Sequence, residues 1–220
     1  TTLAPENSQQ QVVYHQWGHK QVVKPSVFSN PIVEDAVDSM ITSAKSSELF
    51  PNNAPFCLFS LPKISQTSIG AIVVCREPIF YHKLLKQRDT MISPVNNQLE
   101  LINEPALREA VLAANPLLVP KVDDISRNFD LSEKTIRKNL AVIGDIFDDL
   151  NLYLPNEERL PSNIVIDDSS TSSENLYSRV PFEVQEKQRT FYDYQSLECK
   201  RVWLLPCHAQ ARWGVINEFD

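Results

Sequence analysis

The sequence predicts an α+β protein, in which a mainly helical part with a winged-helix-like unit is followed by a small antiparallel β-sheet. Two patterns carry this prediction: apolar residues recur at helical spacing up to about residue 155, and β-prone runs close the chain. Hydrophobic residues make up 42% of the 220, which is enough for a sizeable core. We therefore expect an extended N-terminal arm at 1–29, a mainly helical domain at 30–155 and a β-rich part at 156–220.

The first helix is expected directly after the arm. Asn30 and Pro31 are residue types that cap and open a helix. Apolar residues then recur at helical spacing, at Val33, Val37, Met40, Ile41 and Ala44. The sequence thus predicts a helix with one buried face, ended by the PNNAP segment at 51–55.

Two short strands and two further helices follow. The apolar runs 56–61 and 69–75 are β-prone and are expected to form a hairpin. Glu-Pro steps open the helices, one over 77–91 and one over 104–115. The SPVNN segment at 93–97 is expected to separate them.

The sharpest local pattern is 122–140, VDDISRNFDLSEKTIRKNL, which has the form of a helix, a tight turn and a second helix. The apolar positions of the first helix are Val122, Ile125 and Phe129, and those of the second are Ile136, Leu140 and Ile143. Leu131 marks the turn, and Ser132 is expected to cap the second helix. The expected nucleic-acid-binding side chains are Ser132, Lys134, Thr135, Arg137 and Lys138.

Residues 122–140 resemble the helix-turn-helix of DeoR-type bacterial regulators, which have a similar Ser-x-x-Thr-Ile-Arg helix start. The departures are Ser126, where Ala is usual, and Asp130, where Gly is usual. The resemblance implies a DNA-reading helix within 122–144, and the segment 147–166 could supply a last helix and a wing.

The net charge of the chain limits the interpretation of residues 122–144 as a DNA-reading unit. The chain carries 21 basic and 28 acidic residues, a formal net charge of −7, which argues against a protein that coats nucleic acid. The segment 121–140 has five basic and four acidic residues, whereas 141–160 has one basic and five acidic. Winged helices also bind proteins and peptides, for which an acidic flank is no handicap.

The C-terminal part is expected to supply the sheet. A polar loop at 156–163 and a strand at 164–166 precede a second polar loop at 167–175. Three β-prone runs then follow, at 176–184, 197–205 and 211–216.

A catalytic alternative rests on carboxylates in this β-rich part. Asp167 ends the strand at 164–166, while Glu198 and Lys200 share a face of the next strand. The set is similar to the Asp…Glu-x-Lys arrangement of restriction-type nucleases. That resemblance implies Mg²⁺ held by Asp167 and Glu198, with Lys200 orienting the attacking water.

A second family resemblance lies upstream. The segments PFCLFSLP (55–62) and INEPALREAVLAANPLL (102–118) look like the N-terminal part of lantibiotic dehydratases. The later Arg/Thr/Pro-Phe-Gly signature of that family is absent here, so its glutamyl transfer is not implied. The resemblance implies a partner protein in peptide modification.

Cysteine and histidine usage gives no metal motif. The cysteines are expected to be buried free thiols in a reducing compartment, and they are Cys57, Cys75, Cys199 and Cys207. His15 and His19 are expected at the surface.

The leading hypothesis is a cytoplasmic nucleic-acid-binding or regulatory subunit, not an enzyme, that reads DNA with the helix-turn-helix. The alternatives are a partner protein or peptide-binding module, and a Mg-dependent nuclease. A homodimer is compatible with the leading hypothesis. The sequence predicts no cofactor, no metal site and no membrane contact, since no apolar run approaches about 18 residues.

Overall fold

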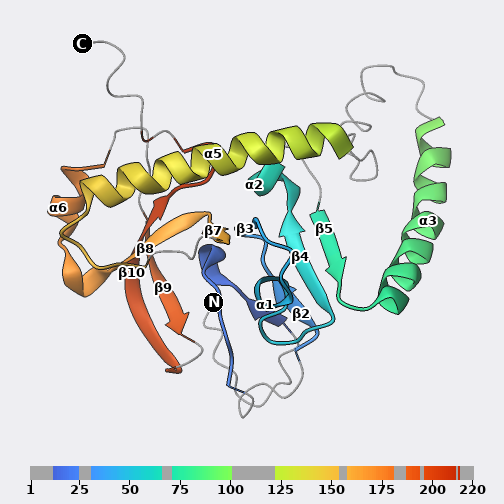
Figure 1. Ribbon diagram of the computed structural model, residues 1–220, viewed down its shortest axis with the longest axis horizontal. Coiled ribbons are helices and arrows are strands. Elements are labelled where there is room, and N and C mark those ends of the chain that lie inside the picture. Colours follow the sequence, from blue (N-terminus) through green and yellow to red (C-terminus); the bar gives the residue numbers. More distant parts are fainter. Residues whose placement is uncertain are drawn as a thin grey trace.

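The computed structural model describes residues 12–24, 31–65, 71–100, 122–153, 158–180, 187–193, 196–211 and 213. This part of the chain is α+β, as the sequence predicts, and Figure 1 shows one long helix lying across several small sheets. Nothing in it tests the predicted division of the chain at residues 29 and 155.

The first sheet has the strand order β1-β2-β4-β5. Its strands are β1 (Val12–Tyr14), β2 (Val33–Asp35), β4 (Phe56–Ser60) and β5 (Ala71–Cys75). β1, β2 and β4 are parallel, whereas β4 and β5 form the antiparallel pair that the sequence predicts. The connection between β4 and β5 contains α2 (Leu61–Ser65).

The prediction of a helix after Pro31 is wrong. Val33–Asp35 form β2, and Ser39–Ile41 form a further strand, β3. Strands form here in place of a helix because this segment has pairing partners that are distant in sequence. β2 pairs with β1 and β4, and the Ala36 N–H donates to the Leu58 carbonyl at 3.0 Å. Such pairing overrides a local apolar spacing.

The second sheet has the order β6-β8-β10-β9 and is antiparallel throughout. Its strands are β6 (Leu152–Tyr153), β8 (Asn163–Asp167), β9 (Lys187–Asp193) and β10 (Glu198–Pro206). The predicted strands at 164–166 and 197–205 are thus confirmed. Leu176 instead belongs to the short helix α6 (Ser173–Tyr177), and most of the run 211–216 lies outside the described residues.

A pair of short strands lies between the two sheets and joins them. β3 (Ser39–Ile41) pairs with β7 (Arg159–Pro161), inside the predicted polar loop, and Met40 lies opposite Leu160. η1 (Gln16–Gly18) lies against this pair: the Ser162 N–H donates to the Trp17 carbonyl at 3.0 Å. The N-terminal segment is therefore held between the two sheets.

The helix-turn-helix prediction is wrong, because Val122–Ile146 form one continuous helix, α5. The predicted turn contains neither glycine nor proline, so nothing local stops the helix there. Ser132 is buried inside α5, so it is not a cap, and the Thr135 hydroxyl donates to the Leu131 carbonyl one turn earlier at 2.9 Å. No winged-helix unit is found in the described residues.

α5 contributes to the two largest hydrophobic cores. Ile136 packs with residues of the first sheet and of β3 and β7, including Met40, Phe59 and Leu160. Ile143 packs with residues of the second sheet, including Ile164 and Leu205. The apolar stripe predicted for 136–143 is therefore correct, although it belongs to a longer helix.

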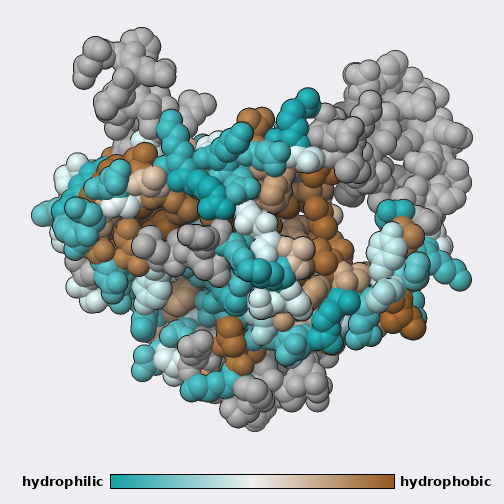
Figure 2. Space-filling view, viewed as in Figure 1, coloured by the Kyte–Doolittle hydropathy of each residue, from teal (hydrophilic) through white to brown (hydrophobic). Residues whose placement is uncertain are grey.

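α3 (Pro78–Glu100) begins where the sequence predicts and continues past the SPVNN segment. Near its start, the rings of Phe80 and Phe56 meet edge to face at 5.2 Å, and Figures 1 and 2 show an opening between the rest of α3 and the body. The helix predicted over 104–115 lies outside the described residues. No helix in the described part of the chain is long and apolar enough to cross a membrane.

Candidate functional site

A buried histidine–carboxylate pair lies between β1 and β2. The His15 Nδ1 atom accepts a hydrogen bond from the Gln21 N–H at 3.0 Å, so the ring proton lies on Nε2, which donates to Glu34 at 3.1 Å. Burial lowers the pKa of His15, and the imidazole is neutral. Burial alone would raise the pKa of Glu34, but hydrogen bonds from His15 and Asn52 outweigh it and lower this pKa.

Asn52 connects this pair to the neighbouring chain segments. Its main-chain N–H donates to Glu34 Oε1 at 2.8 Å, and its side-chain amide donates to Glu34 Oε2 and to the Gln21 carbonyl, both at 2.9 Å. The Val23 N–H in turn donates to the Asn52 side chain at 2.8 Å. The segments 20–24 and 50–54 are therefore fixed to each other by the hydrogen bonds of the half-buried Asn52.

A second buried network involves an arginine. Arg159 on β7 is 2% exposed, and its guanidinium donates to the main-chain carbonyl of Glu48 and to the Ser39 hydroxyl. Its Nε atom lies 3.6 Å from Glu48 Oε2, while Glu48 Oε1 accepts a hydrogen bond from Lys20 Nζ at 2.7 Å. The Glu48 carboxylate thus lies between two cations.

Lys20 opens into a surface depression of about 330 Å³. The depression lies where 20–22 meets α1 (Ser46–Leu49) and the turn that follows it, and its lining residues are Lys20, Val22, Ser46, Ser47, Phe50, Pro51 and Asn53. The lining offers an amine, two hydroxyls and an amide together with apolar carbon. A depression of this size is at the lower end of the roughly 300–1,000 Å³ typical of small-molecule sites.

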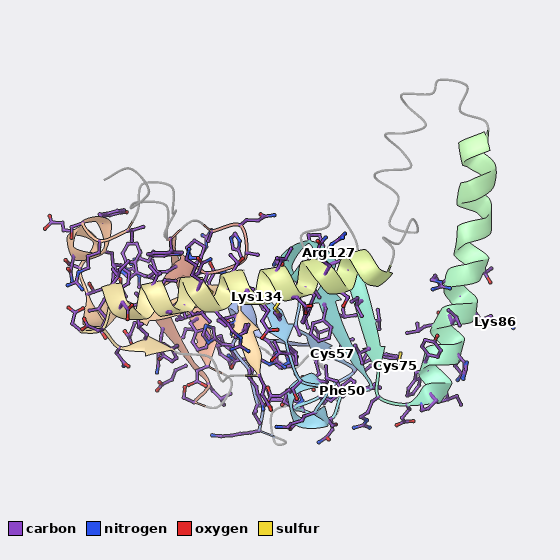
Figure 3. The ribbon with its side chains drawn as sticks, turned by 45° about the horizontal axis from the view of Figure 1, so that its top comes forward. Phe50, Cys57, Cys75, Lys86, Arg127 and Lys134 are labelled. Carbon is purple, nitrogen blue, oxygen red and sulfur yellow. The ribbon has the colours of Figure 1, made fainter. Side chains whose placement is uncertain are left out.

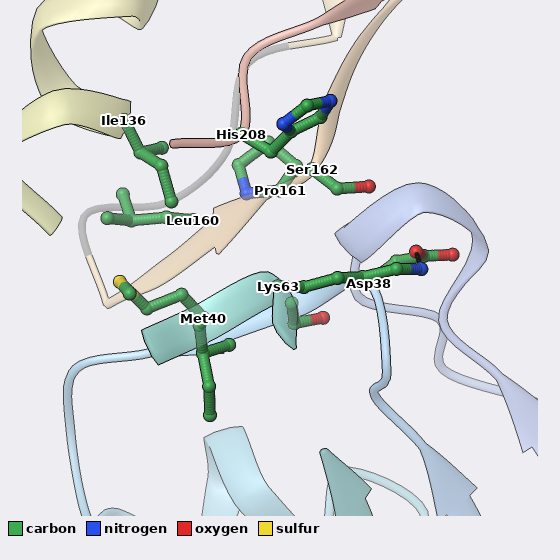
Figure 4. Close-up of a pocket in the computed structure, with 10 residues that line it drawn as sticks. Asp38, Met40, Lys63, Ile136, Leu160, Pro161, Ser162 and His208 are labelled. Atoms are coloured by element: carbon green, nitrogen blue, oxygen red, sulfur yellow. Dashed lines mark hydrogen bonds and ion pairs between the residues drawn. The ribbon is translucent and has the colours of Figure 1, made fainter. Parts of the chain in front are cut away.

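A second constellation surrounds Asp38. One Asp38 carboxylate oxygen pairs with the Lys63 ammonium, and the other accepts a hydrogen bond from the Tyr14 hydroxyl. Lys63 and Asp38 line a cavity of about 10 Å³ together with Ser162 and His208 (Figure 4). That volume holds about one water molecule.

The pKa values of Tyr14 and His208, which lie near Asp38, are shifted from their ordinary values. Burial, and then the hydrogen bond to Asp38, raises the pKa of Tyr14, so the phenol keeps its proton. Burial, and then the positive charge of Lys63, lowers the pKa of His208, so the imidazole is neutral near pH 7. The cavity beside the cluster has no room for a ligand larger than about one water molecule.

Of the side chains predicted to bind nucleic acid, Ser132 is buried, whereas Lys134, Arg137 and Lys138 are exposed on α5. Thr135 bonds to the Leu131 carbonyl. Figure 3 shows Lys134 on the middle of α5. Arg137 pairs with Glu133 at 2.8 Å on the same helix.

The predicted catalytic residues lie on neighbouring strands. Asp167 is opposite Val202 on β10, so Lys200 is two residues and Glu198 four residues further along the strand. Lys200 is near enough to lower the pKa of Asp167, although hydrogen bonds from Ser169 are the larger cause. In the described chain, no three His, Cys, Asp or Glu side chains are placed to hold a metal ion.

Burial differs from expectation at the histidines and agrees in part at the cysteines. The prediction of a surface position is wrong for His15, which is fully buried. The His19 ring donates a hydrogen bond to the Asn163 carbonyl at 3.0 Å. All four cysteines are free thiols; Cys57 and Cys207 are buried, Cys75 is half-buried and Cys199 is exposed. Burial raises the pKa of Cys57 to about 12.

Lys20, Glu48 and Arg159 were missed by sequence reasoning, because they are 28 and 111 positions apart and belong to no shared motif. Arg159 lies in a stretch whose polar composition predicts a loop. The pairing of β3 with β7 and the buried position of Glu48 bring these residues together.

Comparison with known proteins identifies one family. Residues 1–203 match the model of a family described as "Putative PLP-dependent aminotransferase", where PLP is pyridoxal 5′-phosphate. No curated protein and no solved structure matches the chain.

This match corrects the sequence interpretation in two respects. The chain is not shown to be related to DeoR-type regulators or to lantibiotic dehydratases, and the hypothesis of a DNA-binding regulatory subunit is contradicted. The physical reason is the continuous helix α5, which removes the turn on which the DeoR resemblance depends. The description of the family names a cofactor, PLP, whereas the sequence predicts none.

Proposed function

Because the chain belongs to this aminotransferase family, we propose that it takes part in PLP-dependent amino-group transfer and that Lys20 is the lysine that bonds the cofactor. The observation that carries the proposal is the amine of Lys20, which opens into a depression of ligand size. PLP enzymes hold their cofactor through a covalent bond between its carbonyl carbon and a lysine amine.

The donor set of the depression fits the cofactor. The hydroxyls of Ser46 and Ser47 and the amide of Asn53 can donate hydrogen bonds to phosphate oxygens. Val22, Phe50 and Pro51 provide carbon surface for an aromatic ring.

Other lysines with described ion pairs are less suited to this role. Lys63 adjoins a cavity with room for about one water molecule, and its side chain is 44% exposed. Lys45 is 65% exposed and pairs with Glu158. Lys20 is 28% exposed and is held inside the depression by Glu48.

The residues of the depression have distinct tasks in this proposal. The bound cofactor supplies the carbonyl and the electron-withdrawing ring that amino-group exchange requires. Lys20 provides the amine, and Glu48 accepts its hydrogen bond and limits its movement. Phe50 and Val22 provide apolar contacts within the depression.

The test is covalent trapping of the cofactor. The chain is mixed with PLP, reduced with borohydride and digested, and the modified lysine is identified by peptide mass spectrometry. We expect modification mainly at Lys20 and its loss in Lys20→Arg, since arginine forms no such bond.

Lys45→Arg is the matched control, because Lys45 also pairs with a carboxylate and lies next to Ser46. This variant should keep the modification at Lys20. Modification spread evenly over exposed lysines, or unchanged in amount in Lys20→Arg, would contradict the proposal.

A further inference from the structure

We propose that Arg159 is a positioning residue of the Lys20 site: by holding Glu48, it fixes where the Lys20 amine lies. The inference rests on the proposed function, because it concerns how the cofactor lysine is presented. Arg159 lies on β7, beyond Glu48 as seen from Lys20, and it is absent from the lining of the depression.

The contacts form one chain from arginine to lysine. Arg159 binds the same glutamate twice, at its main-chain carbonyl and, at 3.6 Å, at Oε2. The remaining oxygen, Oε1, lies 2.7 Å from Lys20 Nζ. The Glu48 carboxylate therefore lies between the Arg159 guanidinium and the Lys20 amine, with one oxygen near each.

The local backbone does not hold Glu48 in place by itself. Glu48 belongs to α1, a helix of four residues whose N-cap residue, Lys45, makes no side-chain capping bond. So short a helix has little stability of its own. Two hydrogen-bonding groups of Glu48 instead contact a strand that is 111 residues away.

The position of the Lys20 amine also depends on Glu48. It lies in a segment that is neither helix nor strand, and a lysine amine sits on a flexible four-carbon stem. Its hydrogen bond to Glu48 limits that freedom. Reacting groups need positions accurate to about 0.5 Å, and this accuracy comes from residues that support the contact residue.

The experiment compares two Arg159 contacts. Arg159→Lys keeps a positive charge but lacks the planar fork of donors with which arginine reaches both the carbonyl and the carboxylate of Glu48. Ser39→Ala removes a different contact of Arg159, the 3.0 Å bond to the Ser39 hydroxyl, and leaves Glu48 untouched. Melting temperatures are recorded for both, so that loss of stability is measured separately.

Two readouts are used for each folded variant. One is the rate at which an amine-reactive reagent labels Lys20 relative to Lys45 in the chain without cofactor, and the other is the rate of PLP trapping at Lys20. In Arg159→Lys we expect trapping to slow by about tenfold and the labelling ratio to change. In Ser39→Ala both should remain as in the parent, whatever the melting temperature.

The outcomes separate the two proposals. If the parent is not trapped at Lys20, the proposed function fails. If the parent is trapped and Arg159→Lys matches it in both readouts, or if Ser39→Ala shows the same change as Arg159→Lys, the positioning role fails. If Arg159→Lys does not fold, Glu48→Gln takes its place: it keeps the main-chain contact to Arg159, and unchanged readouts would overturn the inference equally.

Discussion

Buried, neutral histidines make the free energy of unfolding of this protein depend on pH. His19 donates to the Asn163 carbonyl, and burial lowers its pKa from 6.5 to about 4. The unfolded chain therefore binds a proton first as the pH falls. The free energy of unfolding contributed by neutral His19 is present above about pH 6.5 and is lost as the pH falls from 6.5 towards 4.

We predict that lowering the pH from 7 to 5 reduces the free energy of unfolding by on the order of 2 kcal/mol through His19. His19→Gln keeps a donor for the Asn163 carbonyl and removes the titration, so it should flatten this dependence. Urea unfolding at several pH values measures the effect. His82→Gln is the control, since His82 is exposed on α3, and an equal flattening in both variants would contradict the assignment.

Two glycines show how the surrounding element decides the effect of a single residue. Gly144 lies in α5 with no heavy atom within 4 Å of where a Cβ would lie. Gly18 ends η1 with φ +98°, and a Cβ there would lie 2.4 Å from the Pro161 Cα and 2.5 Å from the Asp38 carbonyl oxygen. Only the second position requires glycine.

Gly144→Ala should therefore raise the free energy of unfolding by about 1 kcal/mol, because alanine favours the helix. Gly18→Ala should lower it by about 3 kcal/mol, because β7 and the Asp38 main chain would have to move. Thermal and chemical unfolding measure both. A stabilising Gly18→Ala would show that η1 does not touch β7 as described.

The continuity of α5 also explains the failed prediction for this element. Helical spacing, the buried stripe and exposed Lys134 are all visible in the sequence, and the structure retains them. The break between two helices was inferred from Asp130 and Ser132, residue types that also occur inside helices. Continuation of the helix is favoured because Ile125 and Phe129 can then pack on the same core as Ile136.

At the scale of the whole molecule, α5 joins the two largest cores. Ile136 lies in the core beside the first sheet, and Ile143 lies in the core beside the second. β3 and β7 pair between these cores. We therefore expect the described part of the chain to unfold as one cooperative unit.

Ile136→Ala and Ile143→Ala should each lower the free energy of unfolding by about 2–5 kcal/mol. In both variants, tryptophan fluorescence and far-UV circular dichroism should report the same transition, although Trp203 and Trp213 belong to the Ile143 core. Separate transitions for the two signals in Ile136→Ala would contradict a single unit.

Elements whose signals are local could be predicted from the residues alone. The β4–β5 hairpin, the start of α3, the apolar stripe of α5 and the strands β8 and β10 follow from residue periodicity and Glu-Pro or turn signals. The strands β2 and β3 and the meeting of Lys20, Glu48 and Arg159 became visible only in the folded chain. The physical reason is that parallel pairing and a buried ion network depend on partners far apart in sequence, and such partners leave no pattern within either segment.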